Sequence, residues 1–135
     1  MIVVDVSVLA NALADDADDG ALARRELRAV GDFAAPDLVD VETVSVLRKR
    51  WLRRTLTEQR FNAAVAHLVQ LDFERVPTRR LVARAPELRA NVSAYGACYV
   101  ALAETLGCEL LTGDARLAAA TGPRCSVRVL TVSAS

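Results

Sequence analysis

Residues 2–13 have the sequence IVVDVSVLANAL, in which three β-branched residues lead into Asp5 and an alanine-rich stretch follows. The apolar run has the length and composition of a buried strand in a parallel sheet. Residues 6–13 are expected to form a helix, so the strand passes into a helix directly after Asp5. The Asp5 carboxylate is therefore predicted to lie at the carboxyl end of the strand, where sheets of this kind bind ligands.

Strands and helices are predicted to alternate along the rest of the chain. Strands are expected at residues 33–34, 73–76, 108–111 and 127–130, and helices at 21–30, 37–54, 57–71, 78–88, 93–106 and 115–120. Pro36 is expected to open the helix that follows it. Strands separated by helices imply parallel pairing through right-handed crossovers. The predicted fold class is α/β, a three-layer α/β/α sandwich with a central, mostly parallel sheet.

Length and composition indicate one domain that spans residues 1–135, with 53% hydrophobic residues to build its core. Asp5 interrupts the first apolar run almost at once, and no apolar stretch is long enough for a membrane span, so a cytoplasmic protein without membrane association is expected. The three cysteines form no CxxC pair and are expected to be buried thiols. The formal net charge is zero, so any site for a polyanion must come from local clustering of charge.

The helix at 37–54 ends in such a cluster. Its apolar residues are expected to share one stripe that contains Leu38, Val41, Val44, Ser45, Leu47 and Leu52. Its basic residues are Arg48, Lys49, Arg50, Arg53 and Arg54. Cations at a helix C-terminus offset the helix dipole, and arginines also bind phosphate, so a structural role and a role in RNA binding are both open.

Acidic residues follow two of the predicted strands. Asp5 and Asp114 are expected at the same edge of the parallel sheet, with the hydroxyls of Ser7 and Thr112 beside them, and Glu42 in the first turns of its helix. Each acid alone has a structural interpretation, because the aspartates are also suited to cap helices and Glu42 to face solvent. Together they suit a hard divalent cation such as Mg²⁺, which relieves the repulsion between crowded carboxylates.

Four segments carry a family resemblance: VVDVSVLANAL at 3–13, PDLVDVETVSVLRK at 36–49, NVSAYGACYVALAETLG at 91–107 and LLTGDARLA at 110–118. In order and spacing they resemble the signature segments of PIN domains in VapC toxins. The resemblance implies a Mg²⁺- or Mn²⁺-dependent endoribonuclease, with Asp5, Glu42 and Asp114 as catalytic metal ligands supported by Ser7 and Thr112. It also implies a homodimer and a VapB-like antitoxin, through which alone the protein would contact DNA.

One position departs from the family pattern. Gly96 stands where the family ordinarily has an aspartate, so one acidic position of the predicted catalytic set is missing. A glycine inside a helix costs about 1 kcal/mol relative to alanine, and no gain in packing is expected in return. The substitution predicts weakened metal binding and attenuated cleavage.

Two other functions are compatible with parts of the pattern. Gly96 favours a catalytically inactive PIN fold that acts as a binding module through its antitoxin. A strand that ends in Asp5 is also typical of haloacid-dehalogenase-like phosphotransferases. That family needs a second acid two residues on, where this chain has Ser7, and a downstream lysine, whereas Lys49 is the only lysine. The phosphotransferase is therefore the weakest of the three.

Overall fold

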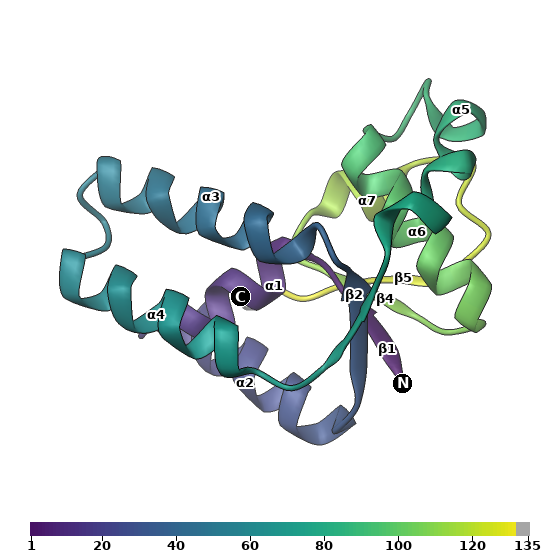
Figure 1. Cartoon of the computed structure of the whole chain (residues 1–135). Coiled ribbons are helices and arrows are strands. Elements are labelled where there is room, and N and C mark those ends of the chain that lie inside the picture. The colour runs from purple at the N-terminus through teal and green to yellow at the C-terminus, as the bar shows by residue number, and fades with distance from the viewer. Residues whose placement is uncertain (132–135) are drawn as a thin grey trace.

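The computed structural model describes residues 1–131, in which five short strands form one sheet (Figure 1). The strands are β1 (Ile2–Val4), β2 (Phe33–Pro36), β3 (Glu74–Val76), β4 (Leu110–Thr112) and β5 (Val127–Val129). They lie in the order β3-β2-β1-β4-β5, and each pairing is parallel. The predicted α/β fold is confirmed, and the strand ends that carry Asp5 and Asp114 belong to neighbouring strands.

Helices cover both faces of the sheet. They are α1 (Val6–Ala14), α2 (Asp18–Val30), α3 (Val39–Leu52), α4 (Glu58–Gln70), α5 (Ala85–Leu88), α6 (Ala94–Leu106) and α7 (Ala115–Ala119). Figure 1 shows α1 to α4 on one side of the sheet and α5 to α7 on the other, with α3 and α4 projecting outward as a hairpin. The central strand β1 is buried along its whole length, as a sheet covered on both faces requires.

Two predicted helices that contain prolines were wrong in their extent. Pro36 ends β2 instead of opening a helix, and α3 begins at Val39. Pro36 has no N–H to donate, but the hydrogen bond to β3 at this point comes from the next residue. The N–H of Asp37 donates to the carbonyl of Val76 at 2.7 Å, so the proline removes no bond from the sheet. The single helix expected at 78–88 is instead two 3₁₀ turns, Thr78–Arg80 and Val82–Arg84, followed by α5. Pro86 has no N–H to donate and cannot continue a helix from the preceding turn.

The apolar stripe expected on α3 was also wrong. The buried residues are Val39, Thr43 and Leu47, which follow one another at the four-residue spacing of a helix face. Val41 is 76% exposed and Leu52 53% exposed. Val41 lies with Val44 in an apolar groove between α3 and α4. One face of α3 is therefore buried in the core, and another lines this groove.

The cysteines are free thiols, but only one of them is buried as expected. Cys98 lies inside α6, whereas Cys108 and Cys125 are half-buried near the beginnings of β4 and β5. Cys98 packs in the core because α6 is almost entirely buried from Ala97 to Ala103. An apolar environment makes Cys98 a packing residue, in agreement with its raised pKa, which comes first from burial.

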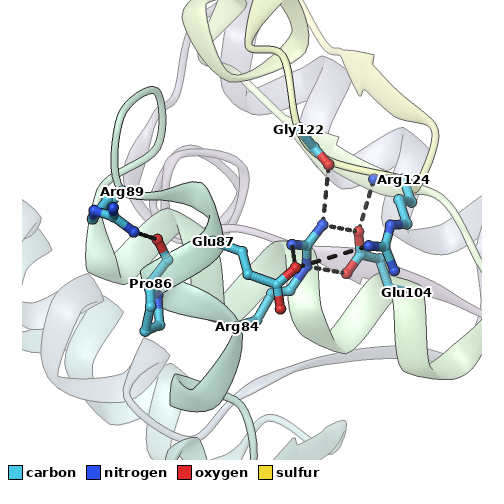
Figure 2. Close-up of polar contacts among 7 residues, drawn as sticks. All are labelled: Arg84, Pro86, Glu87, Arg89, Glu104, Gly122 and Arg124. Atoms are coloured by element: carbon cyan, nitrogen blue, oxygen red, sulfur yellow. Dashed lines mark hydrogen bonds and ion pairs between the residues drawn. The ribbon is translucent and has the colours of Figure 1, made fainter.

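A network of charged groups holds the far end of α6 (Figure 2). The Arg84 guanidinium donates to both carboxylate oxygens of Glu104, at 2.9 and 3.1 Å, and to the carbonyl of Gly122 at 3.0 Å. Glu104 also accepts from the backbone N–H of Arg124 at 2.7 Å. The second 3₁₀ turn, α6 and the segment before β5 are thereby joined, which anchors the helix that carries Gly96.

Candidate functional site

Asp5 is held at the junction of β1 and α1, where it caps the helix. Its Oδ1 accepts the backbone N–H of Ser7 at 3.0 Å, the hydroxyl of Ser7 at 2.5 Å and the N–H of Val8 at 3.4 Å. Its Oδ2 accepts the hydroxyl of Thr112 from β4. Only 7% of Asp5 is exposed, and this burial raises its pKa although the hydrogen bonds oppose the shift.

Ser7 and Thr112 join the two strand ends. The N–H of Gly113 donates to the Ser7 hydroxyl at 2.8 Å, and the N–H of Asp114 donates to the Thr112 hydroxyl at 3.0 Å. Each hydroxyl therefore donates to the Asp5 carboxylate and accepts from the backbone that follows β4. The two short hydroxyl side chains orient Asp5 and fix the approach of the segment that carries Asp114.

Glu42 lies in the first turns of α3 and meets α6. Its Oε1 accepts the phenol of Tyr99 at 2.7 Å. Burial raises the pKa of Glu42, the Tyr99 hydrogen bond lowers it, and the nearby Asp5 carboxylate raises it further. Glu42 and Asp5 are therefore close enough to repel one another, as expected where two carboxylates share a site.

Asp114 has a different environment. It caps α7 by accepting the N–H of Arg116 at 2.9 Å, and the same oxygen accepts Nε of Arg116 at 3.2 Å. Burial acts to raise the pKa of Asp114, but the contacts with Arg116 outweigh it and the pKa is lowered. Because the Arg116 side chain is 93% exposed, this ion pair is weak and readily exchanged for another partner.

A cavity of about 380 Å³ brings the predicted acids together. It is lined by Asp5, Glu42 and Asp114, and also by Gly96, Val92, Tyr95, Tyr99, Arg116 and Leu117. The cavity lies at the carboxyl ends of β1 and β4, where parallel sheets bind ligands. The structure thus places all four positions singled out in the sequence on one cavity.

The donor groups fit a hard divalent cation in kind, because carboxylate oxygens are the ligands that such cations prefer and the carboxylates of Asp5 and Glu42 repel one another. They are not gathered into a finished site. Within residues 1–131, no three His, Cys, Asp or Glu side chains are close enough together to hold a metal ion. Asp114 is turned toward Arg116, so a cation held by all three acids requires that this ion pair open.

Gly96 is the third residue of α6, not a position in the middle of the helix. Its N–H donates to the hydroxyl of Ser93, which caps the helix. A Cβ at this position would lie 2.9 Å from Cγ1 of Val92 and 3.8 Å from Cδ1 of Leu117. The expectation that glycine brings no packing benefit was therefore wrong, because its missing side chain makes room for Val92.

The basic cluster at the end of α3 lies outside this cavity. Arg48, Lys49, Arg53 and Arg54 are exposed, whereas Arg50 donates to the side chain of Asn11 at 2.7 Å. Arg54 has a φ of 62°, a left-handed conformation that ends the helix. Arg50 thus has a structural contact, whereas the other four basic residues are exposed at the end of α3. The hairpin of α3 and α4 projects outward from the sheet (Figure 1).

Sequence reasoning missed the aromatic and apolar side of the cavity. Tyr95 and Tyr99 both lie in the segment that follows Ser93, and Gly96 and Tyr99 are three residues apart, the spacing of one helix face. That spacing was a usable signal for Tyr99. Val92 precedes the helix and offered no comparable signal.

Among the described residues, no helix is both long and apolar enough to span a membrane.

The PIN domain family matches residues 2–123. Ribonuclease VapC9 of Mycobacterium tuberculosis (strain ATCC 25618 / H37Rv) is 39% identical over 130 residues, which cover 96% of this chain and 98% of that protein. Ribonuclease VapC1 of the same strain is 39% identical over 129 residues, with coverage of 95% and 96%.

Two solved structures have the same fold. FitAcB from Neisseria gonorrhoeae superposes with a TM-score of 0.69 at 17% identity, over 94% of this chain and 96% of that one. VapC20 of Mycobacterium tuberculosis, described as a toxin that cleaves the sarcin-ricin loop, superposes with a TM-score of 0.61 at 22% identity, over 82% and 87%.

Proposed function

The chain belongs to the PIN domain family and, within it, to the VapC group, and from this membership we propose that it is the toxin of a type II toxin–antitoxin pair that cleaves RNA. The observation that carries the proposal is the single cavity lined by Asp5, Glu42 and Asp114 at the edge of the parallel sheet. We propose a cytoplasmic location for this activity.

Asp5, Glu42 and Asp114 would hold Mg²⁺ or Mn²⁺ through their carboxylate oxygens. When bound, the ion would supply an activated water and would neutralise charge on the phosphate. If the family's mechanism holds, the bond from phosphorus to the 3′ oxygen would break, leaving a 5′-phosphate and a 3′-hydroxyl. Ser7 and Thr112 keep the Asp5 carboxylate in one orientation through their hydroxyls. Arg116 lies at the edge of the same cavity, and its exposed guanidinium is suited to bind an RNA phosphate once it leaves Asp114.

Gly96 sets the level of the activity. The cavity has three acids where the family pattern has four, so the cation is held by fewer ligands and cleavage is attenuated. An inactive PIN-fold binding module is the second candidate function. It is supported by Gly96, which leaves the cavity one acid short of the family pattern.

The proposed partners are a VapB-like antitoxin, a second copy of the chain and RNA, with DNA contacted only through the antitoxin. The apolar groove between α3 and α4 is a suitable surface for the antitoxin. It is lined by Val41, Val44, Val65, Leu68 and Val69, and both Val41 and Val69 are more than three-quarters exposed. The exposed basic residues at the end of α3 lie on the same pair of helices. They would therefore be next to an antitoxin helix or an RNA bound in the groove.

The test is cleavage of total RNA by the purified chain with Mn²⁺, with Mn²⁺ and excess chelator, and with the Asp5→Asn variant. Cleavage that requires the metal and Asp5 supports the nuclease. Titration calorimetry with Mn²⁺ separates the second candidate, because an inactive module need not bind the ion. No Mn²⁺ binding and no cleavage would refute the nuclease and leave the binding module.

A further inference from the structure

Tyr99 connects the buried face of α6 to an acid of the cavity. Its phenol donates to Oε1 of Glu42 at 2.7 Å, although the two residues are 57 positions apart. The ring is almost fully buried, with 2% of the residue exposed. A buried phenol needs a hydrogen-bond partner, and here the partner is a carboxylate, which makes the bond charge-assisted and strong.

Two of the three acids of the cavity are held in the same manner. Asp5 receives hydroxyls from Ser7 and Thr112, and Glu42 receives the hydroxyl of Tyr99. Among the described residues, Oε1 is the one oxygen of Glu42 with a side-chain hydrogen bond, so Oε2 is left for a ligand in the cavity. The rigid ring of Tyr99 restricts a glutamate side chain that otherwise has three freely rotating bonds.

We propose that Tyr99 is a positioning residue that fixes the Glu42 carboxylate so that its second oxygen faces the divalent cation. This inference rests on the proposed metal-dependent function and extends it to a residue outside the ligand set. Tyr99 acts through Glu42 and is not itself a ligand of the cation. Groups that hydrogen-bond metal ligands commonly change metal affinity about 10- to 100-fold when they are lost.

The Tyr99→Phe variant removes the phenol oxygen and keeps the buried ring, so packing of α6 against the sheet is preserved. The matched control is Thr105→Val in the same helix. It also removes one hydroxyl, which donates to the carbonyl of Ala101 at 2.8 Å and does not line the cavity. Thermal unfolding of both variants without metal compares their effects on folding.

The experiment is Mn²⁺ titration calorimetry on the full chain, in a double-mutant cycle of Tyr99→Phe and Glu42→Gln. Tyr99→Phe is expected to weaken Mn²⁺ binding about 10-fold, whereas Thr105→Val leaves it unchanged. In the Glu42→Gln background, Tyr99→Phe is expected to cause no further loss, because its effect passes through the carboxylate. Cleavage assays should show a lower kcat with an unchanged KM for RNA.

Three results would overturn the assignment. Equal Mn²⁺ affinity of the unchanged chain and Tyr99→Phe removes the positioning role and leaves the proposed nuclease intact. If Tyr99→Phe weakens Mn²⁺ binding as much in the Glu42→Gln background as in the unchanged chain, Tyr99 acts by packing and not through the Glu42 carboxylate. Absence of Mn²⁺ binding by the unchanged chain overturns the positioning role and the metal-dependent nuclease together.

Discussion

Thr112 donates its hydroxyl to Oδ2 of Asp5 across 107 positions of sequence, and the same hydroxyl accepts the N–H of Asp114 at 3.0 Å. One fully buried side chain therefore contacts both strand-end aspartates. Since no solvent reaches Thr112, water cannot take over its contacts if the hydroxyl is removed. The arrangement of the cavity and the stability of the fold are linked through this residue.

Replacing Thr112 by valine should destabilise the fold by about 1 to 3 kcal/mol, because Oδ2 of the buried Asp5 loses its hydrogen bond at nearly constant side-chain volume. Thr112→Ser keeps the hydroxyl and should lose less. Urea unfolding at neutral pH measures both variants. If valine were tolerated and serine were the more destabilising variant, packing of the methyl group and not the hydrogen bond would be the important contact.

Asp5 should lower the stability of the metal-free protein at neutral pH. Burial raises its folded pKa above the ordinary 3.8, so the folded state holds the proton more tightly than the unfolded chain does. The protonated Asp5 carboxyl makes its full contribution to stability below pH 3.8, and this contribution is lost as the pH rises through the folded pKa. Asp5→Asn should therefore raise Tm at neutral pH without metal, and its advantage should shrink on acidification through this range.

Asp37 provides the control of opposite sign for that experiment. The Thr78 hydroxyl and N–H lower the pKa of Asp37, so its contribution to stability is present above the ordinary value and is lost on acidification. Asp37→Asn should lower Tm at neutral pH, with a difference that fades in acid. Parallel pH profiles for the two variants would contradict at least one of the two assignments.

The exposed end of α3 should contribute to RNA binding. Arg48→Gln with Arg53→Gln is expected to weaken binding and to reduce the slope of log affinity against log salt by about 0.7 per lost phosphate contact on single-stranded RNA. Arg50 is left unchanged because it holds Asn11. The control is Arg25→Gln with Arg28→Gln, which removes the same charge from an exposed part of α2. An equal slope for both pairs would indicate that the α3 arginines only offset the helix dipole.

The β1–α1 junction was predictable because local sequence determines it. A short apolar strand that ends in Asp5 and continues into a helix leaves the carboxylate few positions, and parallel pairing then brings Thr112 close. The contact between Tyr99 and Glu42 was not predictable in this way. It depends on how α3 and α6 are rotated about their own axes, which follows from packing across the whole molecule.

The same distinction explains the errors. From hydropathy, Val41 is expected to be buried and Thr43 exposed. The structure has the reverse, because α3 also packs beside α4. The contact of Arg116 with Asp114 depends on a single exposed side chain, for which sequence carries no signal. Gly96 was identified from the family pattern, but its contact with Val92 required coordinates.

Gly96 allows the most direct test of the missing acid, and its surroundings determine how the test must be designed. An added Cβ would lie 2.9 Å from Cγ1 of Val92, a buried β-branched side chain with little rotational freedom. Gly96→Ala should therefore fail to stabilise the helix and should cost about 1 kcal/mol or more through overpacking. Val92→Ala in the same chain makes room, and Gly96→Ala should be tolerated better in that background. Urea unfolding of the four chains measures the coupling.

In the Val92→Ala background, Gly96→Asp should tighten Mn²⁺ binding and raise RNA cleavage, because it adds a carboxylate to the cavity that Asp5 and Glu42 also line. Gly96→Asn is the matched control, with nearly the same shape and no charge. Aspartate at the third position of α6 also favours the helix dipole by about 0.3 to 1 kcal/mol, so unfolding measurements alone cannot separate the two effects. Mn²⁺ affinity and cleavage rate do separate them, since the dipole contribution is present with and without the ion.

Expression of the aspartate chain without an antitoxin should slow host growth more than expression of the asparagine chain. Equal Mn²⁺ affinity, cleavage and growth for the two variants would show that position 96 is not a ligand position, and would remove the main support for an attenuated nuclease.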